Sequence, residues 1–226
     1  MYYYLLLVVP ALLIATWAQI KVKSTFHKYS NYTTDAGLTG AAVSQMIQSA
    51  NGISVPVQPI SGELSDHYDP TQDVIRLSDP VFAVDSVAAV GVAAHETGHA
   101  LQYADNYAPI RVRMKMVPIT NFAAGLSPYL IMFGIIAGFD PLAYFGIALF
   151  SLSVLFQLIT LPVEFNASGR AVAALSASGR FTDEELHGVK KVLTAAALTY
   201  VAALLVSLMN LLRLILVVAG RGRRRN

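Results

Sequence analysis

The chain has 226 residues, of which 55% are hydrophobic and only 13% are charged. Soluble domains usually carry about 25% charged residues, so this composition and a mean hydropathy of +0.53 exclude an ordinary soluble protein and indicate a membrane protein. The net charge of +2 does not suggest a nucleic-acid partner, and the absence of cysteine excludes disulfides and thiolate metal ligands.

Residues 1–20 are predicted to form a transmembrane anchor. Tyr2 to Ile20 carries no charge and is long enough to cross a bilayer core. A signal peptide has its basic residues before the apolar stretch, whereas here tyrosines come first and the lysines follow, at Lys21, Lys23 and Lys28. We therefore expect an uncleaved helix.

Residues 21–116 are the long polar part of the chain and are expected to hold the water-exposed fold. Their patterns predict, in chain order, an amphipathic helix over Thr39–Ala50, short strands over Ile53–Val57 and Asp73–Leu77, and a helix over Val84–Tyr103. Thr39 is expected to cap the first helix, and Asp85 or Ser86 the second. An edge strand that leads into the second helix could pair with an extended peptide.

Residues 117–162 are predicted to form a transmembrane hairpin. Val117–Gly138 and Leu142–Pro162 are two apolar spans, and the break at Phe139-Asp140-Pro141 separates them.

Residues 163–191 are predicted to form a polar helix over Glu164–Gly179 and the start of another helix. Thr182-Asp183-Glu184-Glu185 is a capping box for the second helix, with Phe181 as its staple residue. Residues 192–226 are predicted to form an apolar helix and a basic tail. A charged residue within that helix, Arg213, would be costly at a bilayer centre. The basic residues nearest the C-terminus follow it, at Arg221, Arg223, Arg224 and Arg225.

The most informative motif is the HExxH pentapeptide from His95 to His99. Residues four apart share one face of a helix, so both imidazoles can bind one Zn²⁺. Glu96 lies beside them and is placed to take a proton from a zinc-activated water. The alternative is a helix that carries two ordinary histidines and a glutamate.

A catalytic zinc usually has three protein ligands, so a third is needed. Asp140 is excluded because the hairpin tip lies across the membrane from the histidines. Asp105 falls six residues after His99, where some proteases place a ligand, but a helix that continues through Gln102 would carry Asp105 away. Helix capping explains the remaining acids, Asp183, Glu184 and Glu185.

Glu164 is the preferred third ligand. Two crossings separate it from His99, so the chain returns to the same side of the membrane. Pro162 suits the first turn of a new helix, where a carboxylate such as Glu164 is electrostatically favoured.

The sequence resembles the membrane neutral zinc metallopeptidases of the YugP type, which are similar in plan to the HtpX/CAAX-type membrane gluzincins. The specific segments are HETGHALQ around His95 and PVEFNAS around Glu164. The resemblance extends over the anchor, the segment Asp66-His67-Tyr68-Asp69-Pro70, Leu77-Ser78 and Leu198-Thr199-Tyr200-Val201. It implies a zinc-dependent membrane endopeptidase in which His95, His99 and Glu164 bind zinc and Glu96 is the catalytic base.

The wider gluzincin pattern often has an aspartate four residues after the ligand glutamate, and this aspartate orients a zinc histidine. Here that position is Ser168, which adds no charge, and Asn166 is an alternative. Further side chains could stabilise the oxyanion, namely His67, His187, Tyr200 and Arg170. The simpler interpretation of His67 is a histidine in a turn or at the edge of a strand. The simpler interpretation of His187 is a solvent-exposed residue of a polar helix.

We therefore expect a mainly α, multi-pass helical membrane protein with a small zincin-like α+β portion. Lysines and arginines near the membrane ends of residues 21–115 and 164–191 favour a cytoplasmic active site in a prokaryotic cell membrane. The expected partners are a lipid bilayer and a protein substrate, either a membrane protein or a misfolded protein, that is cleaved at the bilayer surface. The alternatives are a non-catalytic zinc-binding scaffold or chaperone, and a metal transporter, which would hold its ligands inside the spans.

Overall fold

The computed structural model describes residues 2–222 of the chain. They fall into two compact units. The helical unit consists of Met1–Gln19, Val112–Leu161 and Leu198–Asn226, and the mixed unit consists of Ile20–Arg111 and Pro162–Ala197. The expected basic tail at Arg223, Arg224 and Arg225 lies outside the described residues.

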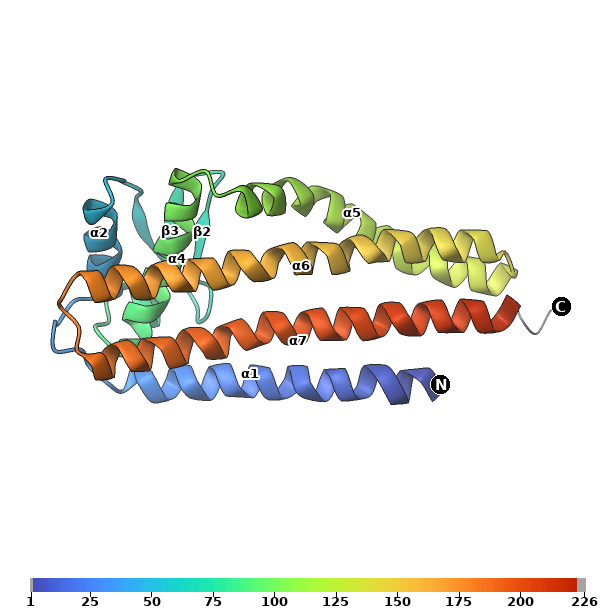
Figure 1. Ribbon diagram of the computed structural model, residues 1–226, viewed down its shortest axis with the longest axis horizontal. Helices are drawn as coiled ribbons and strands as arrows, with labels where there is room; N and C mark the ends of the chain where they lie inside the picture. Colours follow the sequence, from blue (N-terminus) through green and yellow to red (C-terminus); the bar gives the residue numbers. More distant parts are fainter. Residues whose placement is uncertain (1, 223–226) are drawn as a thin grey trace. The chain divides into compact units, whose positions relative to one another are not determined.

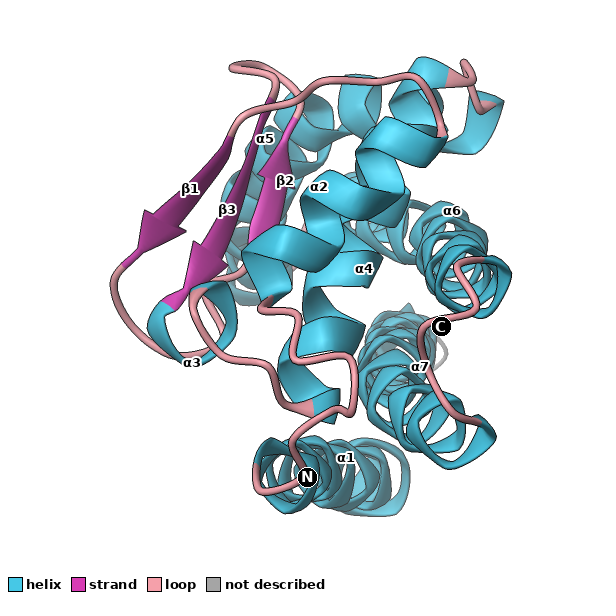
Figure 2. Ribbon diagram, turned by 90° about the vertical axis from the view of Figure 1, so that its left-hand side faces the viewer, coloured by secondary structure: helices cyan, strands magenta, loops and turns pink. Residues whose placement is uncertain are grey.

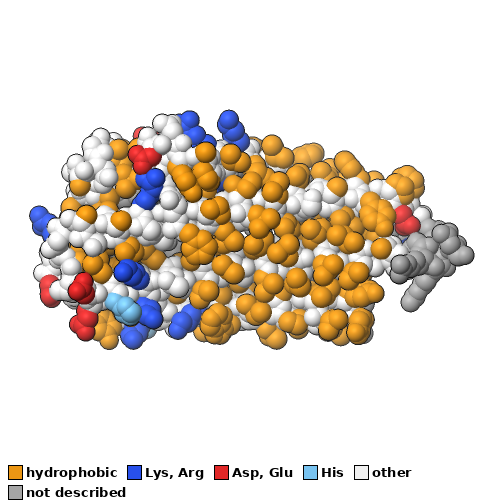
Figure 3. Space-filling view, in the orientation of Figure 1, with side chains coloured by type: hydrophobic (Ala, Val, Ile, Leu, Met, Phe, Trp, Pro, Cys, Tyr) orange, Lys and Arg blue, Asp and Glu red, His pale blue; other side chains and the backbone are white. Residues whose placement is uncertain are grey.

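The helical unit consists of parts of long apolar helices that continue into the mixed unit. After a π-helical turn, η1 (Tyr4–Val8), the helices are α1 (Val9–Ser30), α5 (Ala108–Ala137), α6 (Asp140–Ala177) and α7 (Asp183–Gly222), as Figure 1 shows. With η1 and α1 taken together, the described residues contain 4 helices that are long and apolar enough to cross a membrane. Hydrophobic side chains cover the visible face of this unit (Figure 3). The predicted mainly helical architecture with apolar spans is confirmed.

Helices α5 and α6 form the predicted hairpin. Helix α5 ends at Ala137, and Gly138 has a φ of +67°, a left-handed conformation that suits glycine. A Cβ at Gly146 would lie 2.7 Å from a side-chain carbon of Ile131, so the two helices approach too closely for any larger residue. Figure 1 shows them side by side, joined by a short turn.

The expected start of a new helix at Pro162 is wrong. Helix α6 runs without interruption through Pro162, so Glu164 lies in its interior and not in a first turn. An internal proline removes one backbone hydrogen bond and clashes with the preceding turn, at a cost of about 3 kcal/mol. A stripe of buried residues four apart continues the same helix face beyond the proline and offsets that cost, at Val163, Ala167, Ala171 and Leu175.

The mixed unit contains a three-stranded sheet in the order β1-β3-β2. Strand β3 (Val74–Ser78) pairs in parallel with β1 (Val57–Ile60) and in antiparallel with β2 (His67–Asp69), as Figure 2 shows. Strand β3 matches the expected Asp73–Leu77 within one residue. It is the central strand, so β1 and β2 form the two edges of the sheet.

The expected strand over Ile53–Val57 is misplaced, because β1 begins only at Val57. The preceding residues are held by Gln48 at the end of α2 (Gly40–Ala50). Its backbone carbonyl accepts from the N–H of Ile53, and its side-chain Oε1 accepts from the N–H of Val55. These groups are therefore unavailable to a strand partner. Strand β2 was not predicted at all.

Helix α4 (Val87–Ala104) is the buried centre of the mixed unit, and the short helix α3 (Asp79–Phe82) precedes it. Ser86 caps α4 by accepting from the N–H of Ala89. One face of α4 packs on Ile75, Leu77 and Val81 in one core cluster, and another face packs on a second cluster that includes Ile47, Leu175 and Val189. Because neighbours enclose it, α4 holds its polar side chains in fixed positions.

The capping box at the start of α7 is confirmed. The Thr182 N–H donates to Glu185 Oε2, and the Glu185 N–H donates to Thr182 Oγ1. Phe181 and Leu186, at the two staple positions, lie in the same core cluster. Thr39 caps α2 as expected.

Candidate metal centre

Three side chains from two helices converge in the mixed unit. His95 and His99 project from α4, and their rings lie 4.8 Å apart between centroids. Glu164 projects from α6, and its Oε2 lies 3.3 Å from His95 Nε2 and 3.6 Å from His99 Nε2. One ligand atom from each residue lies within 4.8 Å of the others, a spacing that could hold a metal ion.

The spacing fits a zinc ion. Zinc binds nitrogen and oxygen at about 2.0–2.2 Å in a tetrahedron, which places two ligand atoms on the order of 3.4 Å apart. Both nitrogen–oxygen distances lie close to that value. Glu164 is only 2% exposed and His99 only 7%, whereas His95 is half-buried. A buried carboxylate that faces two imidazoles is a donor set of the kind zinc prefers.

Gly98 allows α4 and α6 to approach closely at this point. A Cβ on Gly98 would lie 2.6 Å from the carbonyl oxygen of Ala167 in α6. Any larger residue would push the helices apart. Since Glu164 lies one turn before Ala167, this contact brings its carboxylate within reach of the histidines.

Each histidine has a partner on its Nδ1 atom. Ser168 Oγ lies 3.1 Å from His95 Nδ1, and Gln102 Oε1 lies 3.0 Å from His99 Nδ1. Such partners fix the ring orientation and direct Nε2 toward a metal. Ser168 is the residue that the sequence pattern indicated for this position.

Gln102 was not recognised from the sequence as a partner of His99. It is fully buried, and its Nε2 donates to the Val163 carbonyl at 2.8 Å and to Asn166 Oδ1 at 2.9 Å. Because both amide protons are used, Oε1 is the atom that faces His99, and it accepts a hydrogen bond from the Nδ1–H of that residue. The sequence does contain a sign of this contact, because Gln102 follows His99 by three residues and residues at this spacing are neighbours on one helix face.

Glu96 lies beside the histidines and contacts the edge strand. It is 9% exposed, and its Oε2 accepts a hydrogen bond from the backbone N–H of Tyr68 in β2 at 3.0 Å. Burial raises the pKa of Glu96 to about 7; Glu164 and Asp66 act in the same direction, while His95 and the Tyr68 N–H oppose it. A carboxyl group of this kind exchanges a proton near neutral pH.

Asp105 and Arg170 are paired with each other in the structure. Arg170 forms an ion pair with Asp105 through Nη1, and its Nε donates to Asn166 at 2.9 Å. Asp105 is an exposed residue at the C-terminal cap of α4 and is not among the three converging side chains.

The other candidates from the sequence have different surroundings. His67 Nδ1 lies 2.7 Å from the Ser65 carbonyl oxygen, and its Nε2 lies 3.4 Å from the Arg76 guanidinium. His187 is exposed on α7. Tyr200 belongs to the helical unit, unlike the three converging residues.

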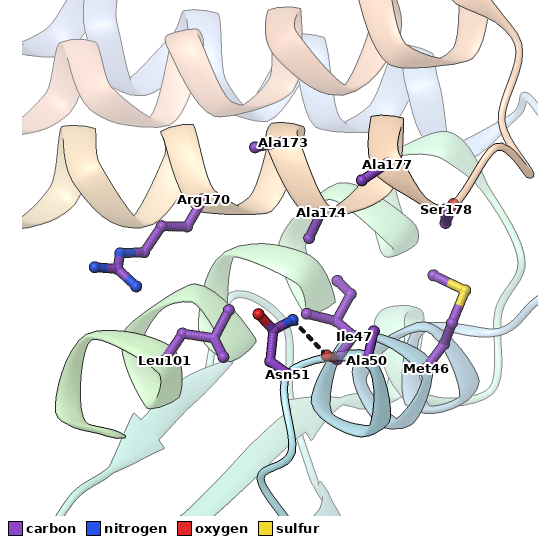
Figure 4. Close-up of a pocket in the computed structure, with 10 residues that line it drawn as sticks. All are labelled: Met46, Ile47, Ala50, Asn51, Leu101, Arg170, Ala173, Ala174, Ala177 and Ser178. Carbon is purple, nitrogen blue, oxygen red and sulfur yellow. Dashed lines mark hydrogen bonds between the residues drawn. The ribbon is translucent and has the colours of Figure 1, made fainter. Parts of the chain in front are cut away.

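Cavities adjoin α4 in the mixed unit, and two of them are lined by described residues. One, of about 530 Å³, is lined by Tyr68, Ala100 and Tyr103, and therefore shares Tyr68 with the contact to Glu96. The other, of about 410 Å³, is an apolar groove between α2, α4 and α6 that has Arg170 at one side (Figure 4). Only the first touches a residue that contacts Glu96.

The sequence matches known proteins over nearly its whole length. Residues 4–219 match a family model described as "Putative neutral zinc metallopeptidase". A Bacillus subtilis (strain 168) protein named "Putative membrane protease YugP" is 50% identical over 215 residues, which cover 95% of this chain and 96% of that relative. No solved structure matches the chain. Both matches extend over the helical and the mixed unit.

Proposed function

This chain belongs to the neutral zinc metallopeptidase family, and from that premise we propose that it is a membrane-embedded, zinc-dependent endopeptidase. His95, His99 and Glu164 are the proposed zinc ligands, and Glu96 is the proposed general base. The observation that carries the proposal is the convergence of these three ligand groups, within 4.8 Å of one another, beside a buried glutamate.

Each of the residues at the proposed site has a separate role in peptide hydrolysis. When bound, zinc supplies a Lewis acid that lowers the pKa of water toward about 7 and polarises a carbonyl group. Glu96 accepts the proton of the attacking water and delivers it to the leaving amine. Ser168 and Gln102 hold the two imidazoles so that each Nε2 faces the ligand position.

Strand β2 is the proposed site of substrate contact. It is one of the two edge strands of the sheet, and its Tyr68 N–H donates to Glu96. An extended peptide that pairs with this edge would place a scissile bond beside the base. The cavity of about 530 Å³ next to Tyr68 offers space for a substrate side chain.

The four long apolar helices support a setting in the membrane, with protein substrates cleaved at the bilayer surface. The relative named as a membrane protease supports the same setting. Exposed lysines of the mixed unit favour its location on the cytoplasmic face, namely Lys21, Lys23, Lys28, Lys190 and Lys191.

The test uses the full-length protein in detergent with casein as substrate. We expect Glu96→Gln to retain zinc as the wild type does and to lose hydrolysis by at least about a hundredfold, because it removes the proton acceptor but no ligand. Glu184→Gln, an exposed glutamate on α7, is the matched control and should hydrolyse casein normally. Equal activity in Glu96→Gln and the wild type would contradict the proposal, and zinc binding without any wild-type hydrolysis would favour a scaffold.

A further inference from the structure

The helical unit contains a group of polar side chains that peptide hydrolysis does not use. Arg213 and Asn210 lie on α7, and Ser127 lies on α5. A charged side chain in an apolar helix is costly and usually marks a functional site. The sequence of this unit offers Arg213 almost no counter-ion, because Asp140 is its only acidic residue.

Two polar atoms of this group, one on Arg213 and one on Ser127, lack hydrogen-bond partners within the described residues. Arg213 Nε and Ser127 Oγ are both buried and make no hydrogen bond within the described residues, and Ser127 is fully buried. The guanidinium of Arg213 lies 5.4 Å from the ring centre of Tyr4, a cation–π contact that does not use the Nε–H as a hydrogen-bond donor. Buried polar atoms without partners are uncommon in folded proteins.

These three side chains line one cavity of about 380 Å³ between α5, α6 and α7. The rest of its wall is apolar and includes Ile131, Met132, Ile136 and Phe150. Met132 and Ile136 are 46% and 73% exposed, so the cavity opens at the surface of the unit. Its volume far exceeds the roughly 30 Å³ that one water occupies.

The cavity lies near one end of these helices. Ile135, which also lines it, accepts a hydrogen bond at 2.7 Å from the guanidinium of Arg221. Arg221 is eight residues after Arg213, so the two arginines are separated by about 12 Å along α7. Asp140 begins α6 at this same hairpin end. An arginine at this depth can reach the level of lipid headgroups.

We propose that this cavity binds an anionic phospholipid. The phosphate accepts hydrogen bonds from Arg213, with Ser127 and Asn210 as further donors, and an acyl chain lies along the apolar wall of α5. A guanidinium presents paired N–H groups that match phosphate oxygens, and basic pockets between transmembrane helices bind anionic headgroups. The inference rests on the proposed membrane setting but does not depend on peptidase activity.

The test measures lipid binding to the delipidated full-length protein in neutral detergent by native mass spectrometry. The probes are phosphatidylglycerol, phosphatidylcholine and oleate. We expect the wild type to retain one phosphatidylglycerol per chain in preference to the other two. In Arg213→Met the apparent affinity for phosphatidylglycerol should fall roughly tenfold or more, whereas Arg111→Gln, an exposed arginine of the mixed unit, should bind as the wild type does.

Unchanged binding in Arg213→Met, or a wild type that binds phosphatidylcholine or oleate equally well, would overturn the proposal. A wild type that retains no lipid would likewise overturn the proposal. Asn210→Leu should show a smaller loss and serves as a second variant if Arg213→Met does not fold. Zinc content and casein hydrolysis of the same preparations separate a failure of this proposal from a failure of the proposed function.

Discussion

Gln102 Oε1 lies 3.0 Å from His99 Nδ1, and the two protons on the Gln102 amide are taken by the Val163 carbonyl and by Asn166. Gln102 therefore ties a proposed zinc ligand on α4 to the backbone of α6, one residue before Glu164. The same amide fixes the proton of His99 on Nδ1 and leaves Nε2 to face the ligand position.

Replacing Gln102 by methionine should weaken zinc binding by roughly 10- to 100-fold, because His99 loses the partner that orients it. A zinc-competition titration with a chromophoric chelator measures this loss. Gln45, an exposed residue on α2, gives the matched control Gln45→Met, which should leave the affinity unchanged. Equal zinc affinity in Gln102→Met and the wild type would show that the amide does not orient His99.

Ser168→Asp should strengthen zinc binding, and Ser168→Ala should weaken it. Ser168 Oγ lies 3.1 Å from His95 Nδ1, so an aspartate here would place a charge beside the imidazole and make it more basic, whereas alanine removes the contact. We expect Ser168→Ala to lose up to about tenfold in affinity in the same titration. The interpretation fails if alanine binds zinc more tightly than aspartate.

Gly98→Ala should destabilise the protein by about 1–3 kcal/mol, because the added methyl would lie against the Ala167 carbonyl and force α4 and α6 apart. It should also lower zinc affinity, since Glu164 would move away from the histidines. Chemical denaturation in detergent and the zinc titration measure the two effects.

The control for this prediction is Gly169→Ala on α6, the helix that Gly98 contacts. A Cβ at Gly169 meets nothing within 4 Å, so the substitution should leave zinc affinity intact and cost no stability. If both glycine variants behave alike, close packing at Gly98 does not position Glu164.

Glu185→Ala should lower the free energy of unfolding by about 1–2 kcal/mol without changing the chemistry of the metal centre. One carboxylate oxygen of Glu185 accepts from the Thr182 N–H and the other from the Asp35 N–H, so the side chain caps α7 and ties it to the segment after α1. Glu184→Ala, at the exposed neighbouring position, should cost far less. Comparable losses in the two variants would contradict this account of the cap.

Local patterns in the sequence predicted several elements well. The Ser86 and Thr39 caps, the capping box at Thr182 and the hairpin break at Phe139 each depend on residues close together in the chain, so their spacing carries the information. The helical positions of His95 and His99 follow from the same kind of pattern.

Features set by contacts between distant segments were not predicted. The local pattern at Pro162 predicts a helix start. In the structure α6 continues through it, because the helix face that follows the proline is buried in the core. Strand β2 has only three residues and depends on pairing with β3. The role of Gln102 depends on partners more than sixty residues away, at Val163 and Asn166.

The most direct test of the zinc centre is the zinc content of purified protein after dialysis, determined for the wild type, Glu164→Ala and Asp105→Ala. We expect one zinc per wild-type chain, a loss of zinc in Glu164→Ala, and full zinc in Asp105→Ala, because Asp105 pairs with Arg170 and lies outside the converging group. Full zinc in Glu164→Ala together with loss in Asp105→Ala would contradict the proposed ligand set.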